Sequence, residues 1–256
     1  MEKLKKLADW IKESNDIVVF TGAGISTESG IPDFRSPGGL WERFDPSEFT
    51  YQNFVSNPLI RRKFWEFYRE NWKVSSTAQP NIAHRAVAAL ERQGKLTAVI
   101  TQNIDGLHQA AGNSPGKVLQ LHGTMWEVRC LSCNDDFYSW KEILNLLEEG
   151  KDVPGCRKCG GLLKPATVSF GQSLPWDTLQ EARRVSMNCE LFICIGSSLV
   201  VYPAAQLPEM AKEAGAKLAI INRESTPLDR IADINIKGEA GELMGSLVEL
   251  LDFSLE

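Results

Sequence analysis

The chain has 256 residues, of which 43% are hydrophobic, a formal net charge of −5 at pH 7 and a sequence pI near 5.4. This length allows one large hydrophobic core, or one core with a small second domain. The acidic balance argues against nucleic acid as the main partner. The sequence contains no run of 18 apolar residues, and its first residues indicate an amphipathic helix instead of a signal sequence. We therefore expect a cytoplasmic protein with no membrane partner.

Helical and strand-like patterns alternate along the chain. An amphipathic helix is predicted over residues 2–14. Apolar runs typical of buried strands then recur at 17–20, 97–101, 117–121, 191–196, 218–222 and 234–237. Helical patterns lie between several of them, at 82–93, 176–186 and 204–214. This alternation predicts an α/β fold with a Rossmann-like, doubly wound parallel sheet, whose ligands bind at the carboxyl ends of the strands.

A glycine-rich turn follows the first predicted strand, in the stretch TGAGISTESGIPDFR over residues 21–35. Gly22 and Gly24 allow a tight turn and a close approach of backbone N–H groups to a phosphate. The stretch departs from the dinucleotide fingerprint G-x-G-x-x-G, because Thr27 stands where the third glycine is expected. It predicts a pyrophosphate cradle, next to which lie an acid, an aromatic ring and a cation: Asp33, Phe34 and Arg35.

Two segments interrupt the alternation of strands and helices. Residues 36–80 are rich in aromatic residues with a helical pattern, and residues 124–166 contain four of the six cysteines. We expect both to be insertions that form one small module, with a ligand cleft between it and the sheet. The larger domain would then consist of residues 1–35, 81–123 and 167–256.

The four cysteines of the second insertion form two C-x-x-C pairs, Cys130 with Cys133 and Cys156 with Cys159, separated by 22 residues. This spacing predicts a tetrahedral zinc site. Four protein ligands leave no open position, so the zinc would serve folding instead of catalysis. The alternatives are four reduced cysteines or a redox pair. The remaining two, Cys189 and Cys194, are expected to be packing thiols.

Polar side chains gather after the strand at 97–101. Gln102, Asn103 and Asp105 could hold a sugar hydroxyl, a water or an amide. Taken alone, the commoner interpretation is a helix start capped by Asn103 or Asp105.

Of the three histidines, His122 follows the strand at 117–121 and has a reference pKa that suits a general base. A lone histidine is more often structural. His84 is expected to be a packing or surface residue, and His108 a structural one.

Two later loops also follow predicted strands. Gly196, Ser197 and Ser198 come after the strand at 191–196 and could bind phosphate or ribose. Asn222 and Glu224 end another strand and could hold ribose hydroxyls. The acid that a Rossmann site carries about 20 residues past its glycines is missing, so a later strand would supply this contact. Each loop alone is weak evidence, because ordinary turns use the same residues.

Taken together, these motifs resemble the sirtuin family, in the same order and spacing from about residue 10 to residue 245. The resemblance implies an NAD-dependent protein-lysine deacylase with a Rossmann-like domain and a small zinc and helical module. An acyl-lysine protein or peptide would bind in the cleft as an added strand.

Roles follow from the resemblance for the matching positions of this chain. The pyrophosphate would be held by Ala23, Thr27 and Arg35. Phe34 would shield the nicotinamide ribose. The ribose and a water would contact Gln102 and Asn103, and the nicotinamide carboxamide would contact Ile104 and Asp105. The adenosine end would contact Ser197, Ser198, Asn222, Arg223 and Ala240. The peptide would pair with Val168, Ser169, Phe170 and Gly171.

The implied reaction consumes NAD as a co-substrate. The acyl oxygen would attack C1′ of the nicotinamide ribose, and His122 would then act as general base through the ribose hydroxyls, with Asn103 as the second catalytic residue. Products would be lysine, nicotinamide and 2′-O-acyl-ADP-ribose, and nicotinamide is expected to inhibit. Mono-ADP-ribosyl transfer to protein and a catalytically silent binding module are the alternatives. A hydride-transferring dehydrogenase is disfavoured by the missing glycine and acid.

The chain departs from family patterns at two positions. Members that remove negatively charged acyl groups carry Tyr-x-x-Arg in the helical insertion, whereas this chain has Tyr68 and then Asn71 at the arginine position. Weak activity on succinyl-lysine is therefore predicted. Gln172 replaces a glutamate that often follows the Phe-Gly of the peptide strand.

Overall fold

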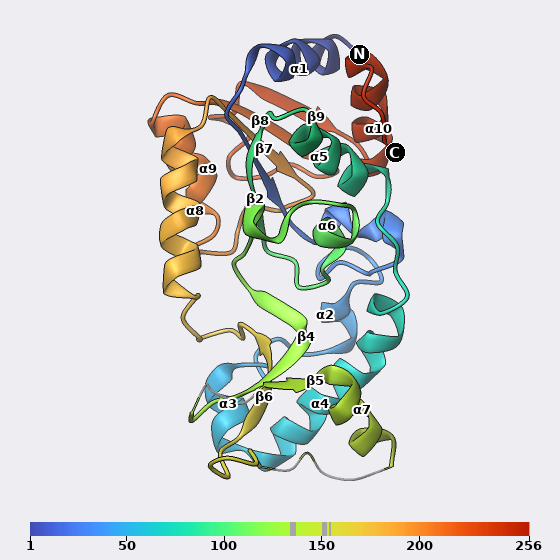
Figure 1. Ribbon diagram of the computed structural model, residues 1–256, viewed down its shortest axis with the longest axis vertical. Helices are drawn as coiled ribbons and strands as arrows, with labels where there is room; N and C mark the ends of the chain where they lie inside the picture. The colour runs from blue at the N-terminus through green and yellow to red at the C-terminus, as the bar shows by residue number, and fades with distance from the viewer. Residues whose placement is uncertain (134–136, 150–152, 154, 256) are drawn as a thin grey trace.

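The computed structural model describes residues 1–133, 137–149, 153 and 155–255 (Figure 1). Its larger half contains a six-stranded sheet in the order β3-β2-β1-β7-β8-β9, and every strand pairing in it is parallel. The strands are β1 Ile17–Thr21, β2 Leu96–Thr101, β3 Val118–Gln120, β7 Leu191–Ile195, β8 Lys217–Asn222 and β9 Ile234–Lys237. The predicted α/β fold with a parallel, doubly wound sheet is confirmed.

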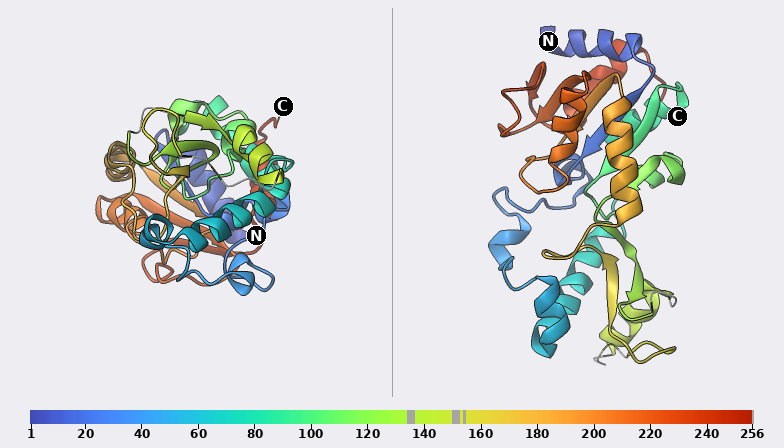
Figure 2. Two further views of the ribbon diagram at one scale, coloured as in Figure 1. Left: turned by 90° about the horizontal axis from the view of Figure 1, so that it is seen from below. Right: turned by 90° about the vertical axis from the view of Figure 1, so that its left-hand side faces the viewer.

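Both faces of this sheet are covered by helices, which explains why its strands are apolar along their whole length. In β1, Ile17 and Val19 belong to one core cluster, while Val18 and Phe20 belong to the other. This alternation follows from the pleat of a strand. The first cluster includes side chains of α1 Glu2–Glu13, α5 Ile82–Arg92 and α10 Ala240–Leu251. The second includes side chains of α8 Trp176–Asn188 and α9 Gln206–Glu213. In the right-hand view of Figure 2 these two helices, coloured yellow-orange and orange, lie on the side of the sheet that faces the viewer.

The order of strands in the sheet reverses at β1, which makes it the topological switch point. Strands β2 and β3 lie on one side of β1, and β7, β8 and β9 lie on the other. At the carboxyl ends of the two central strands, Thr21 is paired with Ile195. Ligands of open parallel sheets bind at such a switch point, so the topology places a site where β1 and β7 end. Short elements follow the strands at this edge, namely η1 Ala23–Ile25 and η2 Thr27–Ser29 after β1 and α6 Leu107–Ala110 after β2, whereas η3 Pro115–Lys117 precedes β3.

The smaller half is built around an antiparallel sheet in the order β5-β4-β6 (Figure 1). Its strands are β4 Gly123–Cys130, β5 Phe137–Ser139 and β6 Leu163–Thr167, and its helices are α2 Leu40–Arg43, α3 Tyr51–Ser56, α4 Pro58–Ser75 and α7 Trp140–Glu148. Aromatic side chains from both insertions form its core: Trp65 stacks on Trp140 with ring centroids 5.7 Å apart. The two insertions therefore pack together. Residues 134–136, 150–152 and 154 of the second insertion lie outside the described residues.

Local signals in the sequence explain where the long helix α4 begins. Asn57 precedes it, and its side-chain oxygen accepts a hydrogen bond from the backbone N–H of Leu59. Pro58 occupies the first helical position, where no backbone donor is needed. Among the described residues, no helix has the length and apolar character needed to cross a membrane. The expected cytoplasmic location stays a prediction.

Candidate cofactor and peptide cleft

A cleft of about 680 Å³ runs from the carboxyl edge of the parallel sheet to the smaller half. Every residue that the sequence predicted to bind cofactor or peptide lines it. From the sheet side these are Gly22, Ala23, Gly24, Thr27, Asp33, Phe34, Arg35, Gln102, Asn103, Ile104, Asp105, His122, Gly196, Ser197, Ser198, Asn222, Arg223, Glu224 and Ala240. From the segment after β6 they are Val168, Ser169, Phe170 and Gly171. The motifs that follow separate strands thus meet in one cavity.

Glycines join the two loops at the switch point. The backbone N–H of Gly24 donates to the carbonyl of Gly196 at 2.8 Å, and a Cβ on Gly24 would lie only 2.8 Å from the Cα of Gly196. Gly196 itself has φ 62°, in the left-handed region. These glycines are therefore required by the contact between the loops, in addition to any approach of a phosphate. The turn continues into the 3-10 turns η1 and η2, not into a long helix.

Asn103 is held at the base of the cleft by two hydrogen bonds. Its Nδ2 donates to the carbonyl of Gly22 and to Oγ of Ser26, both at 3.1 Å. These bonds use both protons of the amide nitrogen and leave Oδ1 available as an acceptor. Helix α6 begins only at Leu107, where the acceptor is Asp105, so the interpretation of Asn103 as the helix cap is wrong. Its amide oxygen is free to hold a hydroxyl or a water.

Asp105 combines the two roles considered from the sequence. Its Oδ1 accepts a hydrogen bond from the backbone N–H of Leu107 at 2.9 Å, at the start of α6. Its Oδ2 accepts one from Oγ of Ser26 at 2.8 Å. The side chain is buried, and burial raises the pKa of Asp105. It is thus an acceptor in a site with little water, suited to an amide N–H.

His122 has a defined tautomer. Its Nδ1 lies 2.9 Å from the carbonyl oxygen of Gln102, which can only accept, so Nδ1 carries the proton and Nε2 is the basic nitrogen. Burial lowers the pKa of His122, and the bond to Gln102 opposes that shift. Near neutral pH the ring is uncharged and able to take a proton at Nε2. The side chain of Gln102 in turn donates to Oγ of Ser197 at 2.8 Å, joining the loops after β2 and β7.

The other two histidines lie behind the cleft. His84 and His108 are 0% and 1% exposed, so His84 is not a surface residue. Their rings are 5.1 Å apart, edge to face. His108 Nε2 is 2.9 Å from Oγ1 of Thr21, and His84 Nε2 is 3.5 Å from Oγ of Ser26. Burial lowers the pKa of His84 to about 4 and that of His108 to about 3, so both are neutral.

Arg223 connects the loop after β8 to the loop that carries Asp33. Its guanidinium donates to Oγ of Ser36, lies 3.9 Å from Asp33 Oδ2 and lies 3.6 Å from Glu239. Burial opposes ionisation of Asp33, but hydrogen bonds from Ser36 and from the backbone N–H of Arg35 outweigh it and lower the pKa of Asp33. An anionic carboxylate therefore organises this loop beside the cleft.

The predicted peptide segment begins at the end of β6. The backbone N–H of Val168 donates to the carbonyl of His122, which places the segment directly beside the basic histidine. The carbonyl of Phe170 accepts from the backbone N–H of Tyr51 at 2.9 Å, so helix α3 is tied to the same segment. Phe170 is 44% exposed, with its ring 5.9 Å from that of Trp41. The segment offers an apolar rim to a bound chain.

The four cysteines of the C-x-x-C pairs come together, with their sulfur atoms all within 4.8 Å of one another. The Cys130–Cys159 and Cys133–Cys156 sulfurs are 3.5 and 3.8 Å apart. Zn–S bonds of about 2.3 Å in a tetrahedron require sulfurs about 3.8 Å apart, so the donor set fits one zinc ion. Backbone N–H groups, first that of Cys133, lower the pKa of Cys130 to about 6 and favour its thiolate. Cys189 and Cys194 are buried elsewhere, as expected.

Comparison with known proteins decides the family. The model of the Sir2 family matches residues 22–203. The chain belongs to the Sir2 family. It is 49% identical to NAD-dependent protein deacylase 2 of Archaeoglobus fulgidus over 250 residues, which are 97% of this chain and 96% of the relative. It is 45% identical to an NAD-dependent protein deacetylase of Thermodesulfovibrio yellowstonii over 250 residues, 98% and 96% of the two chains.

Solved structures of Sir2 proteins have the same fold. One, from work on the mechanism and regulation of Sir2 enzymes, has a TM-score of 0.88 at 48% identity and covers 98% of each chain. Another, a Sir2 protein with a p53 peptide and NAD+, has a TM-score of 0.87 at 42% identity and covers 96% of this chain and 97% of that one. The resemblance to the sirtuins is confirmed.

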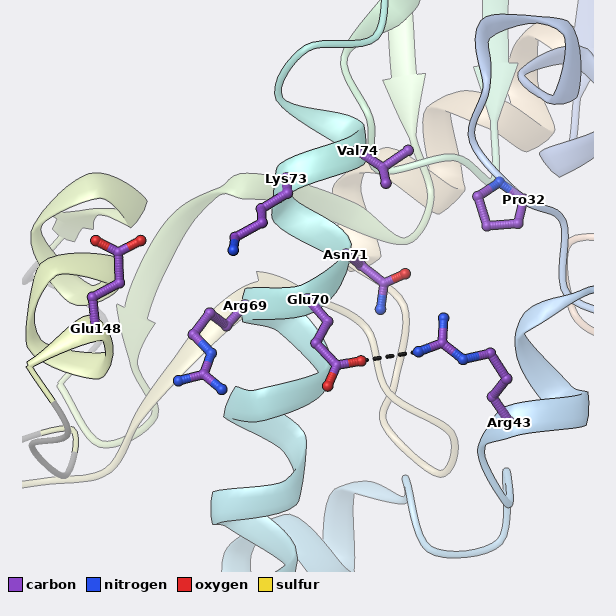
Figure 3. Close-up of a pocket in the computed structure, with 8 residues that line it drawn as sticks. All are labelled: Pro32, Arg43, Arg69, Glu70, Asn71, Lys73, Val74 and Glu148. Atoms are coloured by element: carbon purple, nitrogen blue, oxygen red, sulfur yellow. Dashed lines mark hydrogen bonds and ion pairs between the residues drawn. The ribbon is translucent and has the colours of Figure 1, made fainter.

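Two features of this Sir2 chain are not predicted by its sequence motifs. Ser26, which belongs to the glycine-rich stretch 21–35, joins Asn103 to Asp105. A second pocket of about 530 Å³ is lined by residues of α4 together with Pro32, Arg43 and Glu148 (Figure 3). In it Arg43 of α2 pairs with Glu70 of α4 at 3.1 Å. Asn71 and Pro32 line both this pocket and the main cleft, so the two adjoin there.

Proposed function

We propose that this chain is an NAD-dependent protein-lysine deacylase that transfers an acyl group from lysine to ADP-ribose. The observation that carries the proposal is the tautomer of His122, whose basic Nε2 belongs to a residue that lines the cleft and directly contacts the peptide segment. The names of its relatives support the same reaction.

The cleft fits NAD. When bound, NAD would supply ADP-ribose as the acceptor of the acyl group and nicotinamide as the leaving group. We assign the pyrophosphate to the glycine junction with Ala23, Thr27 and Arg35, and the nicotinamide end to Phe34, Gln102, Asn103, Ile104 and Asp105. We assign the adenosine end to Ser197, Ser198, Asn222, Arg223, Glu224 and Ala240. The free Oδ1 of Asn103 and the buried carboxylate of Asp105 are acceptors that a ribose hydroxyl and a carboxamide N–H would satisfy.

His122 would act as the general base by taking a proton at Nε2. The carbonyl of Gln102 accepts from Nδ1–H, which orients the ring and stabilises the imidazolium that forms. Asn103, held by Gly22 and Ser26, would position a hydroxyl or water at the same place.

The acyl-lysine peptide would lie along Val168, Ser169, Phe170 and Gly171 as an added strand. This arrangement uses both halves of the molecule. We therefore propose one domain made of residues 1–35, 81–123 and 167–256, and a small domain made of the insertions 36–80 and 124–166. One zinc ion on the four cysteines would hold the small domain in shape.

Mass spectrometry of an acetyl-lysine peptide, with and without NAD, tests the proposal. We expect loss of acetyl only with NAD, with equimolar nicotinamide and O-acetyl-ADP-ribose, and slower turnover when nicotinamide is added. Protein labelling from NAD that exceeds lysine deacylation would instead support the alternative, mono-ADP-ribosyl transfer. The intact His122 and Asn103 and the names of the relatives favour deacylation.

A further inference from the structure

The loop assigned to nicotinamide is held from the smaller half of the molecule as well as from the sheet. On the sheet side, the carboxylate of Asp105 accepts a hydrogen bond from Oγ of Ser26. Its backbone carbonyl instead accepts one from Nε1 of Trp126 on β4, at 2.8 Å. The preceding carbonyl, that of Ile104, accepts one from the backbone N–H of Met125 at 3.1 Å. Two successive carbonyls of the loop are therefore fixed by one strand of the smaller half.

The strand β4 can make these bonds because its own pairing is interrupted there. It pairs with β6 at Gly123 and again from Val128 onward, and it pairs with β5 over residues 127–129. Within the part of the chain that the structure describes, residues 124–126 thus have no paired residue on either neighbouring strand. The donors of this interrupted segment bond to the loop instead of extending the sheet.

The indole of Trp126 fits closely between the loop and helix α4. Gly106 follows Asp105 with φ 77°, and a Cβ on it would lie 2.8 Å from Nε1 of Trp126. Glycine adopts this backbone conformation readily and leaves room for the ring. The indole also meets Trp72 of α4, with ring centroids 5.0 Å apart at an angle of 71°. Because Trp72 packs on the aromatic core of the smaller half, Trp126 connects that core to the loop.

Trp126 acts on the cleft from outside it. Its residue does not line the cleft, whereas Ile104, Asp105 and Met125 do. The indole has a single polar group, and that donor is used on the carbonyl of Asp105. A peptide group is planar, so fixing the carbonyls of Ile104 and Asp105 also fixes the direction of the N–H groups that follow them. The side chain can therefore influence a ligand only through the orientation of this loop.

We propose that Trp126 is a positioning residue for the nicotinamide end of the cleft. The inference rests on the proposed deacylase function, in which nicotinamide is the leaving group and an inhibitor. By holding the carbonyl of Asp105, the indole keeps the loop in the orientation that receives the carboxamide. The pyrophosphate and the adenosine are assigned to other loops, which Trp126 does not contact. Trp126 therefore increases the affinity for nicotinamide and leaves that for ADP-ribose unchanged.

Inhibition of acetyl-peptide turnover by nicotinamide and by ADP-ribose tests this role. The two inhibition constants are measured for the wild type and for Trp126→Phe, which removes the N–H and keeps an aromatic ring. We expect the constant for nicotinamide to rise about fivefold, the effect of one hydrogen bond, and the constant for ADP-ribose to stay as it is. A general loss of folded structure would change both constants, so their ratio reports on the loop alone. Trp10→Phe, whose ring contacts Lys6 and Lys217 outside the cleft, is the matched control and should keep the wild-type ratio.

The possible failures are distinguishable. An unchanged ratio in Trp126→Phe overturns the positioning role, while acetyl turnover still supports the deacylase. Equal increases in both constants also overturn it, in favour of a purely structural role in joining the two halves. If the phenylalanine variant does not fold, Trp126→Leu removes the same N–H and decides. No turnover of any acyl peptide by the wild type defeats the proposed deacylase, and this inference with it.

Discussion

The two halves of the molecule are stabilised in different ways. The parallel sheet is covered on both faces by aliphatic side chains of five helices, and β1 is buried at every position. The smaller half has three antiparallel strands, an aromatic core and the cysteine cluster. Stability is thus distributed over a large core in the first half and concentrated in a few contacts in the second. A small core of this kind commonly depends on a metal.

The walls of the cleft repeat this contrast. The sheet side presents a connected polar network, in which Ser26 joins Asn103 to Asp105 and Gln102 joins His122 to Ser197. The opposite wall combines aromatic side chains with a few neutral polar groups, among them the hydroxyls of Tyr68 and Thr167 and the amide of Asn71. We infer that the sheet side orients the reacting groups, whereas the smaller half supplies a mostly aromatic wall and depends on the cysteines for its shape.

Removing the metal should reveal the largest difference in stability between the two halves. Cys130→Ser should release zinc and disorder the smaller half, because structural zinc in small domains contributes on the order of 10 kcal/mol. Hydrogen exchange should show loss of amide protection in β4, while β1 stays protected. Cys189→Ser, outside the cluster, should retain zinc. Protein that is purified without chelator and contains no stoichiometric zinc would contradict this prediction.

The catalytic contribution of the sheet side is tested by His122→Ala. We expect kcat to fall by roughly 10²-fold or more, with NAD binding by calorimetry largely unchanged. The wild-type activity should decrease on acidification through a pKa below 6.5, because the base must be unprotonated and burial lowers its pKa. Near wild-type turnover in the variant would refute the assignment.

The sequence predicted the sheet well because its strands are continuous apolar runs. The predicted strand at 234–237 coincides with β9, and that at 17–20 falls one residue short of β1. Helix α10 was not predicted, since Gly241 and Gly245 weaken its helical pattern. Strands β4 and β6 were not predicted either. Pro165 lies within β6, and proline is unusual inside a strand.

The site residues were predictable where they follow strands in short motifs, as Asn103 and His122 do. Their partners were not, because those contacts form only in the folded chain. Tyr68 and Thr167 are 99 positions apart, and Arg223 and Ser36 are 187 apart. Asn103 is the clearest example of a side chain whose role the sequence leaves open. Its sequence position is compatible with a helix cap, and only the folded chain shows that Gly22 and Ser26 hold it.

The stability of the sheet half should also depend on pH. His84 and His108 have pKa values lowered by burial to about 4 and about 3, whereas the unfolded value is about 6.5. Below pH 6.5 the unfolded chain binds protons that the folded chain does not. Stability is therefore full above pH 6.5 and falls with acidification, by up to about 1.4 kcal/mol per pH unit for each histidine.

Urea unfolding of the wild type and of His84→Gln, followed from pH 7 to pH 5, measures this effect. The variant should be less stable at pH 7 but lose less stability toward pH 5, because glutamine does not titrate. Equal slopes in the two proteins would show that the buried histidines do not set the acid sensitivity.

The smallest effect is expected for substitution of Arg223, which joins the loop after β8 to the loop that carries Asp33. Arg223 contacts Ser36, Asp33 and Glu239, and its side chain is 48% exposed, so water screens these ion pairs. If they hold the loop in place for NAD, Arg223→Ala should raise KM for NAD about twofold to fivefold, with kcat for an acetyl peptide less affected. High salt should raise the KM of the wild type for NAD toward that of the variant, since exposed ion pairs are screened.

Arg184→Ala, which breaks an exposed pair with Glu181 on α8 outside the cleft, is the matched control and should leave KM for NAD as it is. An Arg223→Ala enzyme with unchanged KM would mean that the backbone hydrogen bonds to Asp33 suffice to hold the loop, and it would contradict the assignment of Arg223 to the adenosine end of NAD.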